Sequence, residues 1–548
     1  MAQARVQLDR VIDIDPANAM GHYWLGALHG MDGNREAAIR HLSHAISIRP
    51  DFAAAHADLG NVMLLDGDAE AAIRCYRTAL GHDPLLTSAY CNLARALRKV
   101  GQDGRALECL LKALELAPLE DNAFLELVRL MLEQGRADGA RVIAEQQAAI
   151  HPERALVHRA AGLVALDRHD PEAALQYFQK ARALAPPDAD LWLTTGIALQ
   201  ELLHLDQALA AYTAALSIDA SFAPARWRIA LVRLLQGDFA RGWPDYEARH
   251  ISADRPRRDF PYPRWGGEPL QGRTILVYAE QGLGDEIMFA SCLPDVIRAA
   301  GLCIIDCHPK LEPIFRRSFP GALVHGGEQT AGTRAWLAGF PVPAFQIPAG
   351  SLPLLLRRAR EEFPQHAGYL RADPGRVEFW RTRLAALGPG LKVGISWKGG
   401  TKLTRAALRS LSLDALLPVL RTHGVRFVNL QYAPDDQELK ALADRHGVHI
   451  ESWPDAVVDY DETAALICAV DLVISVCTAV VHLGGALGCP VWVMAPYSPE
   501  WRYGHAGPDI PWYPSVRVYR QPGFRQWSPV IHQVASDLHH LAAPALAR

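Results

Sequence analysis

Small and bulky apolar residues recur with a period of 34 residues through the first 220 residues of the chain. One position of each period is alanine, and the position four residues later is bulky in most periods, as Leu42, Tyr76, Leu110, Phe178 and Tyr212. Prolines follow the same period, at Pro16, Pro50, Pro84, Pro118, Pro152 and Pro186. Small residues let two helices approach closely, and bulky residues fill the space between helix pairs. The pattern therefore predicts helix–turn–helix units that bury their apolar faces by stacking.

Other repeat positions agree with this interpretation. The alanines are Ala38, Ala72, Ala106, Ala140, Ala174 and Ala208, and Leu-Gly pairs precede the first two, at Leu25-Gly26 and Leu59-Gly60. The unit at 121–154 departs from the pattern because Ala144 stands at its bulky position, and the period fades after Ala220. Residues 1–250 resemble the tetratricopeptide repeat family. The resemblance implies an α-helical superhelix that holds a polypeptide.

The hydrophobic pattern changes after residue 272 to short β-rich runs, most of them separated by helical stretches. The runs are Thr274–Ala279, Cys303–Cys307, Ala322–His325, Lys392–Trp397, Val425–Gln431, Leu472–Val476 and Val491–Met494. Such alternation predicts parallel sheets with helices on both faces. Residues 251–272 carry four prolines and a Gly-Gly step and are predicted to be a linker. A Pro/Gly-rich stretch near 341–375 divides the runs into two doubly wound lobes, 273–375 and 376–548, across a cleft.

Composition narrows the class of protein. The chain has 548 residues, 21% of them charged, and a net charge of −4, which fits a globular protein with no nucleic-acid partner. No apolar stretch reaches the roughly 20 residues that a membrane span needs. The amino terminus reads as half of a repeat helix without a signal peptide, and the nine cysteines form no CxxC pair. We therefore expect a cytoplasmic protein with reduced thiols.

Candidate chemistry lies in the loops that follow three of the predicted strands, because ligands of such sheets bind at the carboxyl ends of strands. In the first loop, Gly282 and Gly284 would let the backbone turn sharply near a ligand. Asp285 would either cap the next helix or project into the cleft as a general base. The glycine spacing alone is weak evidence, since the third glycine of the dinucleotide fingerprint is absent.

The second and third loops have the features of an anion site. Lys398-Gly399-Gly400-Thr401-Lys402 follows a strand and precedes Arg405 and Arg409, which indicates either a phosphate-binding edge or a solvated basic turn. Thr478 would cap a helix whose amino end suits a diphosphate. His482, four residues on, would either face that ligand or be a core histidine.

Together these loops resemble the heptosyltransferase-type glycosyltransferases of family 9, which have the GT-B fold, in the variant fused behind tetratricopeptide repeats. The resemblance rests on Tyr278–Ile287, Val393–Thr401, Arg409–Asp414, Leu472–Val493 and Tyr497–Tyr503. It implies a nucleotide-sugar donor, an inverting transfer without a metal ion or other cofactor, and Asp285 as the catalytic base. It also implies that Gly282, Gly284, Ser396, Lys398, Arg409, Gln431, Thr478 and His482 surround the donor. One departure is Cys477, where the family has aspartate, which favours a shifted donor.

The fusion to repeats bears on the acceptor. The first helices of the clearest repeats present Asp58, Asn61, Asn92 and Arg95. These side chains either hydrogen-bond an extended polypeptide or simply form a solvent-exposed helix face. We expect a protein acceptor, and similar enzymes include cytoplasmic flagellin glycosyltransferases. Two alternatives stay open. The chain would otherwise build lipopolysaccharide or another surface polysaccharide, or it would be a non-catalytic scaffold, for which Cys477 is the best argument.

Overall fold

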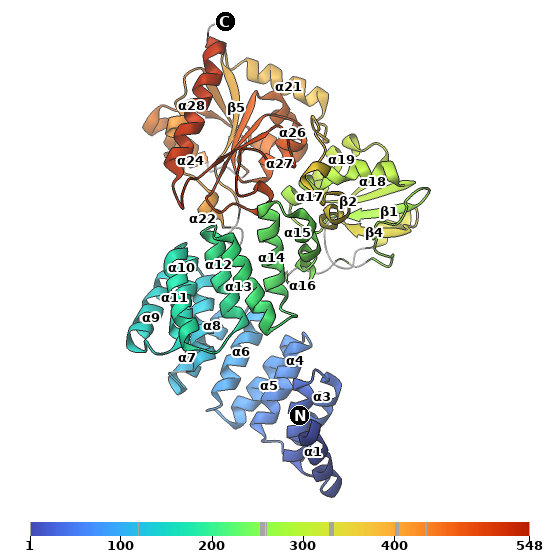
Figure 1. The fold of residues 1–548 in the computed structure, drawn as a ribbon, viewed down its shortest axis with the longest axis vertical. Coiled ribbons are helices and arrows are strands. Elements are labelled where there is room, and N and C mark those ends of the chain that lie inside the picture. The colour runs from blue at the N-terminus through green and yellow to red at the C-terminus, as the bar shows by residue number, and fades with distance from the viewer. Residues whose placement is uncertain are drawn as a thin grey trace. The chain divides into compact units, whose positions relative to one another are not determined.

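The computed structural model describes residues 2–118, 120–252, 258, 260–327, 334–400, 405–432 and 436–546. The chain separates into two compact units, Met1–Pro187 and Asp188–Arg548. The first unit is helical throughout its described length (Figure 1). Its helices are α1 (Ala2–Ile14), α2 (Ala19–Met31), α3 (Arg35–Ile48), α4 (Ala53–Leu65), α5 (Ala69–His82), α6 (Thr87–Lys99), α7 (Asp103–Leu116), α8 (Asp121–Glu133), α9 (Ala137–Ile150), α10 (Ala155–Asp167) and α11 (Pro171–Leu184).

The repeat positions pack as the sequence pattern predicts. All six alanines are fully buried, and so are the five bulky residues four positions later. The bulky side chain covers the glycine of its own helix pair: a β-carbon built on Gly60 would lie only 2.7 Å from Cε1 of Tyr76, and one on Gly26 would lie 2.6 Å from Cγ of Leu42. A side chain at the glycine position would thus collide with the residue that fills the pair. The prediction of tetratricopeptide-type helix pairs is confirmed.

The irregular unit at 121–154 exchanges sizes between these two positions. Val128 stands where other units have glycine or alanine, and Ala144 stands at the bulky position. Both side chains are fully buried in the same apolar cluster. The first helix therefore supplies the volume that the second helix lacks, which keeps the core filled.

Helix pairs continue into the second unit, beyond the point where the period fades. These helices are α12 (Ala189–Glu201), α13 (Leu205–Ile218), α14 (Ala223–Gln236), α15 (Phe239–Tyr246) and α16 (Arg249–Ser252). The last of them belong to the same compact unit as both sheets. Part of the helical array is thus built into the α/β region.

Two parallel sheets form the rest of this unit. The first has the order β3-β2-β1-β4 and the second β10-β9-β8-β5-β6-β7. The strands are β1 (Thr274–Tyr278), β2 (Leu302–Cys307), β3 (Ala322–Gly326), β4 (Phe345–Pro348), β5 (Leu391–Ser396), β6 (Val425–Asn429), β7 (Ile450–Glu451), β8 (Leu472–Val476), β9 (Val491–Ala495) and β10 (Val516–Arg520). The seven predicted runs are all strands, and the sequence pattern missed β4, β7 and β10. Of these, β4 lies in a proline-rich stretch and β7 has two residues. In β10, arginines at two of the five positions interrupt the apolar pattern.

Helices cover both faces of the second sheet. Figure 1 shows α28 (Trp527–Leu546) and α24 (Asp436–His446) on one side of β5, with α26 (Tyr460–Ala469) on the other. Buried Val534 and Leu538 of α28 pack with Ile395 of β5 in one apolar cluster. The remaining helices of this unit are α17 (Leu283–Phe289), α18 (Leu293–Ala299), α19 (Glu312–Ser318), α20 (Leu352–Leu356), α21 (Pro374–Ala385), α22 (Ala406–Arg409), α23 (Leu417–Leu420), α25 (Pro454–Val458) and α27 (Ala479–Ala486).

The segment predicted to be a linker packs against the first sheet wherever the structure describes it. Phe260, Trp265 and Leu270 are buried, and Phe260 shares a cluster with residues of β1 and β2. Arg258 forms a buried ion pair with Asp306 at the end of β2. Residues 253–257 and 259 of this segment lie outside the described residues. The described residues thus form a cover over the strands.

Candidate functional site

Loops at the carboxyl ends of β1, β5, β6, β8 and β9 line one cleft of about 800 Å³ within the second unit. The cleft brings together residues from both sheets. Its lining includes eight of the nine residues predicted around the donor and the reacting atoms, namely Gly284, Asp285, Ser396, Lys398, Arg409, Gln431, Thr478 and His482. Gly282 begins α17 as its N-cap residue and is not among the lining residues. Thr401 and Lys402 lie outside the described residues.

The two glycines of the first loop have ordinary backbone conformations. Neither has a positive φ, so neither makes a turn that demands glycine. A β-carbon on Gly284 would instead lie 3.0 Å from Cδ2 of His482 and 3.6 Å from Cα of Ala479. The glycine therefore lets α17 approach α27 closely. The chain does turn at Gly282–Asp285 beside the cleft, but close packing of the two helices is what suits glycine to position 284.

Asp285 lies at one end of a row of alternating charges. Its Oδ1 accepts a hydrogen bond of 2.5 Å from Nη2 of Arg502. Arg502 also pairs with Glu500, and the other carboxylate oxygen of Glu500 lies 2.5 Å from Nη1 of Arg409. The four side chains are only 11% to 20% exposed. We call Asp285, Arg502, Glu500 and Arg409 the charge row.

Burial affects the ionisation of this row. Burial alone would lower the pKa of Arg502, but the carboxylates of Asp285 and Glu500 outweigh it and raise that pKa above its usual value. The guanidinium therefore stays charged at any physiological pH. Partly buried charges attract one another more strongly than exposed ones, since water screens them less.

Gln431 braces the loop that follows β5. Its Oε1 accepts hydrogen bonds from the Ser396 hydroxyl at 3.1 Å and from the backbone N–H of Trp397 and Lys398 at 3.1 and 2.8 Å. The predicted role facing a nucleotide is therefore joined by a structural one. Lys398 is about half exposed, and its ammonium lies 2.5 Å from Glu438. Its charge is thus held at the rim of the cleft.

Thr478 and His482 begin α27 at the floor of the cleft. Thr478 caps the helix by accepting a hydrogen bond of 3.2 Å from the N–H of Val480. His482 is 4% exposed and hydrogen-bonds the hydroxyls of Tyr513 at 3.1 Å and Tyr503 at 3.4 Å. Burial, with Arg502 and Arg409 nearby, holds the pKa of His482 well below its usual value. His482 is therefore a neutral, hydrogen-bonded core residue that also lines the cleft.

Cys477 is as buried as the strand before it. The side chain is 1% exposed, and burial raises the pKa of its thiol to about 12. Its Sγ lies 4.0 Å from the carbonyl oxygen of Met494. The residue at this position is thus a neutral thiol, which cannot supply the charge that an aspartate would bring.

The loop after β9 supplies cleft residues that the sequence reasoning missed. Glu500, Arg502 and Tyr503 all line the cleft, and Trp501–Tyr503 form a short 3₁₀ helix, η7. Arg520 fixes this loop, because its guanidinium donates to the carbonyl oxygens of Tyr503 at 2.6 Å and Gly504 at 2.9 Å. The available signal was the stretch Tyr497–Tyr503, which contains these three residues and is one of those that carry the family resemblance.

Three of the predicted acceptor-binding residues form a network within the first unit. Nδ2 of Asn61 donates to Asp58 at 3.1 Å, and Oδ1 of Asn61 accepts from Asn92 at 2.9 Å and from Tyr76 at 2.8 Å. The amide of Asn61 is therefore engaged by its neighbours. Arg95 is exposed on the same helix as Asn92. Binding of a polypeptide by these four residues stays a prediction.

Comparison with known proteins places the chain in a family. A tetratricopeptide repeat family model matches residues 87–118. Protein FlbA of Caulobacter vibrioides is 33% identical over 430 residues, which cover 75% of this chain and 71% of FlbA. The chain belongs to the FlbA family.

Solved tetratricopeptide structures match only parts of this FlbA-family chain. A tetratricopeptide repeat protein of Parabacteroides merdae is 17% identical, with 41% of this chain and 89% of that chain covered and a TM-score of 0.37. Yeast Tom70 is 16% identical, with 46% and 55% covered and a TM-score of 0.39. Within the described residues, no helix is long and apolar enough to cross a membrane.

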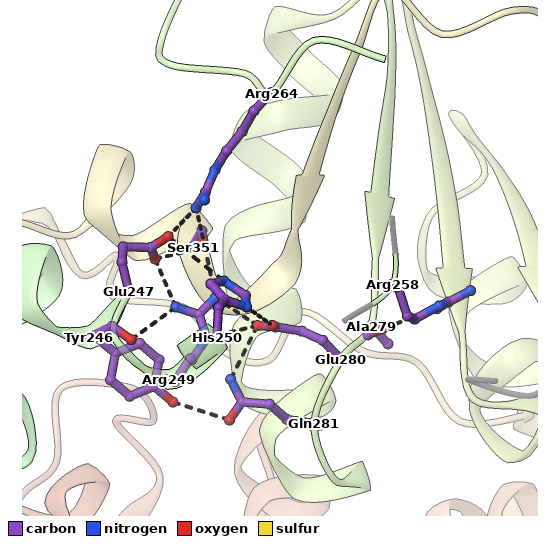
Figure 2. Close-up of polar contacts among 10 residues, drawn as sticks. All are labelled: Tyr246, Glu247, Arg249, His250, Arg258, Arg264, Ala279, Glu280, Gln281 and Ser351. Atoms are coloured by element: carbon purple, nitrogen blue, oxygen red, sulfur yellow. Dashed lines mark hydrogen bonds and ion pairs between the residues drawn. The ribbon is translucent and has the colours of Figure 1, made fainter. Parts of the chain in front are cut away.

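A second polar network holds the loop that carries Asp285 in the FlbA-family chain (Figure 2). Arg249 is 5% exposed and donates to Glu280 and to Ser351, each at 2.7 Å, and to Glu247 at 2.7 Å. Next to it, the hydroxyl of Tyr246 donates to Gln281 at 3.1 Å. Glu280 and Gln281 directly precede the Gly282–Asp285 turn. Side chains of α15 and α16 therefore hold the segment that leads from β1 into the loop carrying Asp285.

Aromatic side chains complete this junction. The indole N–H of Trp243 in α15 donates to the carbonyl oxygen of Arg357 at 2.7 Å. Its ring lies 5.5 Å from that of Trp501 and 6.3 Å from that of Trp512, both edge-on. Trp243 is 1% exposed. Trp243 thus contacts residues that follow β4 of the first sheet and β9 of the second.

Proposed function

We propose that this FlbA-family chain is a glycosyltransferase of the GT-B type, which moves a sugar from a nucleotide-sugar donor to a protein acceptor held by its repeats. One observation carries the proposal: two carboxylates and four cationic side chains line one cleft between two parallel sheets, namely Asp285, Glu500, Lys310, Lys398, Arg409 and Arg502. A volume of about 800 Å³ fits a nucleotide-sized ligand.

The proposed reaction inverts the anomeric carbon. An acceptor oxygen attacks that carbon, the carbon–oxygen bond to the phosphate breaks, and Asp285 takes the acceptor's proton. Negative charge grows on the departing nucleotide phosphate, where Arg409, Lys398 and the amino end of α27 stabilise it. These groups meet the charge without a metal ion in the proposed mechanism.

The repeats support the choice of acceptor. Stacked helix pairs form extended surfaces that bind polypeptides, and such repeats indicate a protein-interaction scaffold. We propose a protein acceptor, with flagellin as the first candidate to test. Incubating the full chain with the donor it accepts and with flagellin should add one sugar mass or more to the protein. Transfer to a saccharide acceptor and to none of the proteins tested would contradict the protein-acceptor proposal.

Turnover of nucleotide sugars tests the activity itself. A panel of nucleotide-sugar donors should include one that the full chain hydrolyses or transfers, and Asp285→Ala should lower kcat by about 10²- to 10⁴-fold, the usual contribution of a general base. Asp537→Asn is a matched control, because Asp537 is also 20% exposed and paired with an arginine, Arg517, but does not line the cleft. If kcat of Asp285→Ala stayed within tenfold of wild type, Asp285 would not be the base. If no donor were turned over, the chain would be a scaffold.

A further inference from the structure

In the charge row, the proposed base Asp285 accepts a hydrogen bond from an arginine, Arg502. Asp285 shares Arg502 with Glu500, and Glu500 shares its two oxygens between Arg502 and Arg409. Each arginine that lines the cleft is therefore already paired with a carboxylate of the protein. A carboxylate oxygen that accepts a guanidinium N–H is less available to accept a proton from a substrate.

An incoming diphosphate presents the same chemistry as Glu500 with more charge. Phosphate oxygens bind guanidinium groups through paired, charge-assisted hydrogen bonds, as carboxylates do. A diphosphate in the cleft therefore competes with Glu500 for Arg409 and Arg502. If Arg502 turns toward the diphosphate, its hydrogen bond to Asp285 is lost.

The backbone of the loop that carries Arg502 is held by contacts that do not involve the Arg502 guanidinium. Arg520 holds the carbonyl oxygens of Tyr503, Gly504 and Gly507, which fixes the loop on one side. The Arg502 guanidinium lies 5.5 Å from the centre of the Trp501 ring, and that ring is packed against Trp243. The Trp501 ring thus gives the guanidinium a cation–π contact and no hydrogen-bond acceptor.

We propose that Glu500 and Arg502 couple diphosphate binding to the loss of the hydrogen bond between Arg502 and Asp285. In the structure Glu500 pairs with both arginines, and Arg502 donates to Asp285. A bound diphosphate takes over both arginines, and Asp285 loses this guanidinium partner before it accepts the acceptor's proton. Glu500 and Arg502 are positioning residues in this scheme, which rests on the proposed function and adds an order of events to it.

Binding of inorganic pyrophosphate to the full chain tests the competition without any sugar transfer. Glu500→Gln keeps the shape of the side chain and removes its charge, so pyrophosphate should bind about tenfold tighter than to wild type, or about 1.4 kcal/mol. Asp285→Asn should also tighten binding, by several-fold, since it too loosens Arg502. Asp537→Asn should leave the dissociation constant unchanged. Titration calorimetry measures all four proteins, and thermal melting checks that each is folded.

The sign of the change separates the coupling from a structural role. Damage to the cleft weakens pyrophosphate binding, whereas release of an arginine strengthens it. Equal or weaker binding by folded Glu500→Gln would overturn the coupling, and so would weaker binding by Asp285→Asn if Glu500→Gln failed to fold. Absence of binding in all four proteins would overturn it as well.

The same experiment distinguishes this coupling from the proposed function. Sugar transfer by wild type together with unchanged pyrophosphate affinity in Glu500→Gln would refute the coupling and leave the glycosyltransferase standing. Tighter binding by the variants without turnover of any donor would support the competition for the arginines and refute the enzyme.

Discussion

Trp243 of α15 connects the helices of the second unit to its α/β region. It is 1% exposed, its ring packs edge-on against three others, and its N–H holds the Arg357 carbonyl oxygen. Replacing a buried aromatic residue by alanine costs about 3–5 kcal/mol. The carbonyl oxygen left without its donor adds about 1–3 kcal/mol where water does not reach it. We therefore expect Trp243→Ala to destabilise the second unit by at least about 3 kcal/mol.

The fluorescence of the chain suits this measurement. Trp24 is the only tryptophan in the sequence of Met1–Pro187, so indole emission reports almost entirely on Asp188–Arg548. Trp24→Ala serves as the control, because Trp24 is 50% exposed and its loss should cost less than about 0.5 kcal/mol. Denaturant unfolding of the full chain, followed by emission, gives the free energies. A Trp243→Ala value within 1 kcal/mol of wild type would refute the view that α15 is integral to the sheets.

Three further predictions concern the networks and the repeats. Arg249→Met should destabilise the second unit by about 3–5 kcal/mol, because Glu280 and Glu247 lose their buried cation. The control Arg241→Met changes an arginine that is 74% exposed and should cost less than about 0.5 kcal/mol in the same unfolding assay. Gly60→Ala should destabilise its helix pair by about 1–3 kcal/mol, because the added methyl group collides with Tyr76. Gly81 in α5 has open space around it, so Gly81→Ala should stabilise the same pair by up to about 1 kcal/mol. Hydrogen exchange of residues 53–82 measures both changes, and changes of the same sign would contradict this explanation. Because the pKa of His482 lies well below that of the unfolded histidine, near 6.5, the unfolded chain takes up a proton first as the pH falls, so stability is full above about pH 6.5 and decreases below it. Between pH 7 and 5.5, wild type should lose about 1 kcal/mol more than His482→Gln, and equal losses would show that the buried imidazole is not the cause.

Local spacing made the repeats predictable. The burial of Ala72, Tyr76 and Gly60 follows from their positions within one helix pair, so contacts at short sequence separation determine them. The carboxyl ends of the strands were predictable for a similar reason, since each loop directly follows its apolar run. Eight of the nine residues that the sequence predicted around the donor and the reacting atoms therefore line the cleft.

Ion pairs within the cleft could not be predicted in this way. Asp285 and Arg502 are 217 residues apart, and their contact depends on how the two sheets face each other. The same holds for Arg249, which the sequence reasoning placed at a domain boundary and which instead holds the loop after β1. His482 shows a further limit, because a residue can line a cleft and be satisfied in the core at once. Spacing alone cannot separate the two conditions.

The position of the division between the compact units bears on how the chain can be re-engineered. In this chain the helices from Ala189 to Ser252 belong to the same compact unit as both sheets, and Trp243 and Arg249 connect them to it. A graft that joins foreign repeats at residue 250 would replace Trp243 and Arg249 and so remove their contacts, whereas a graft at Pro187 keeps them. The useful splice site thus lies about two repeats before the end of the helices.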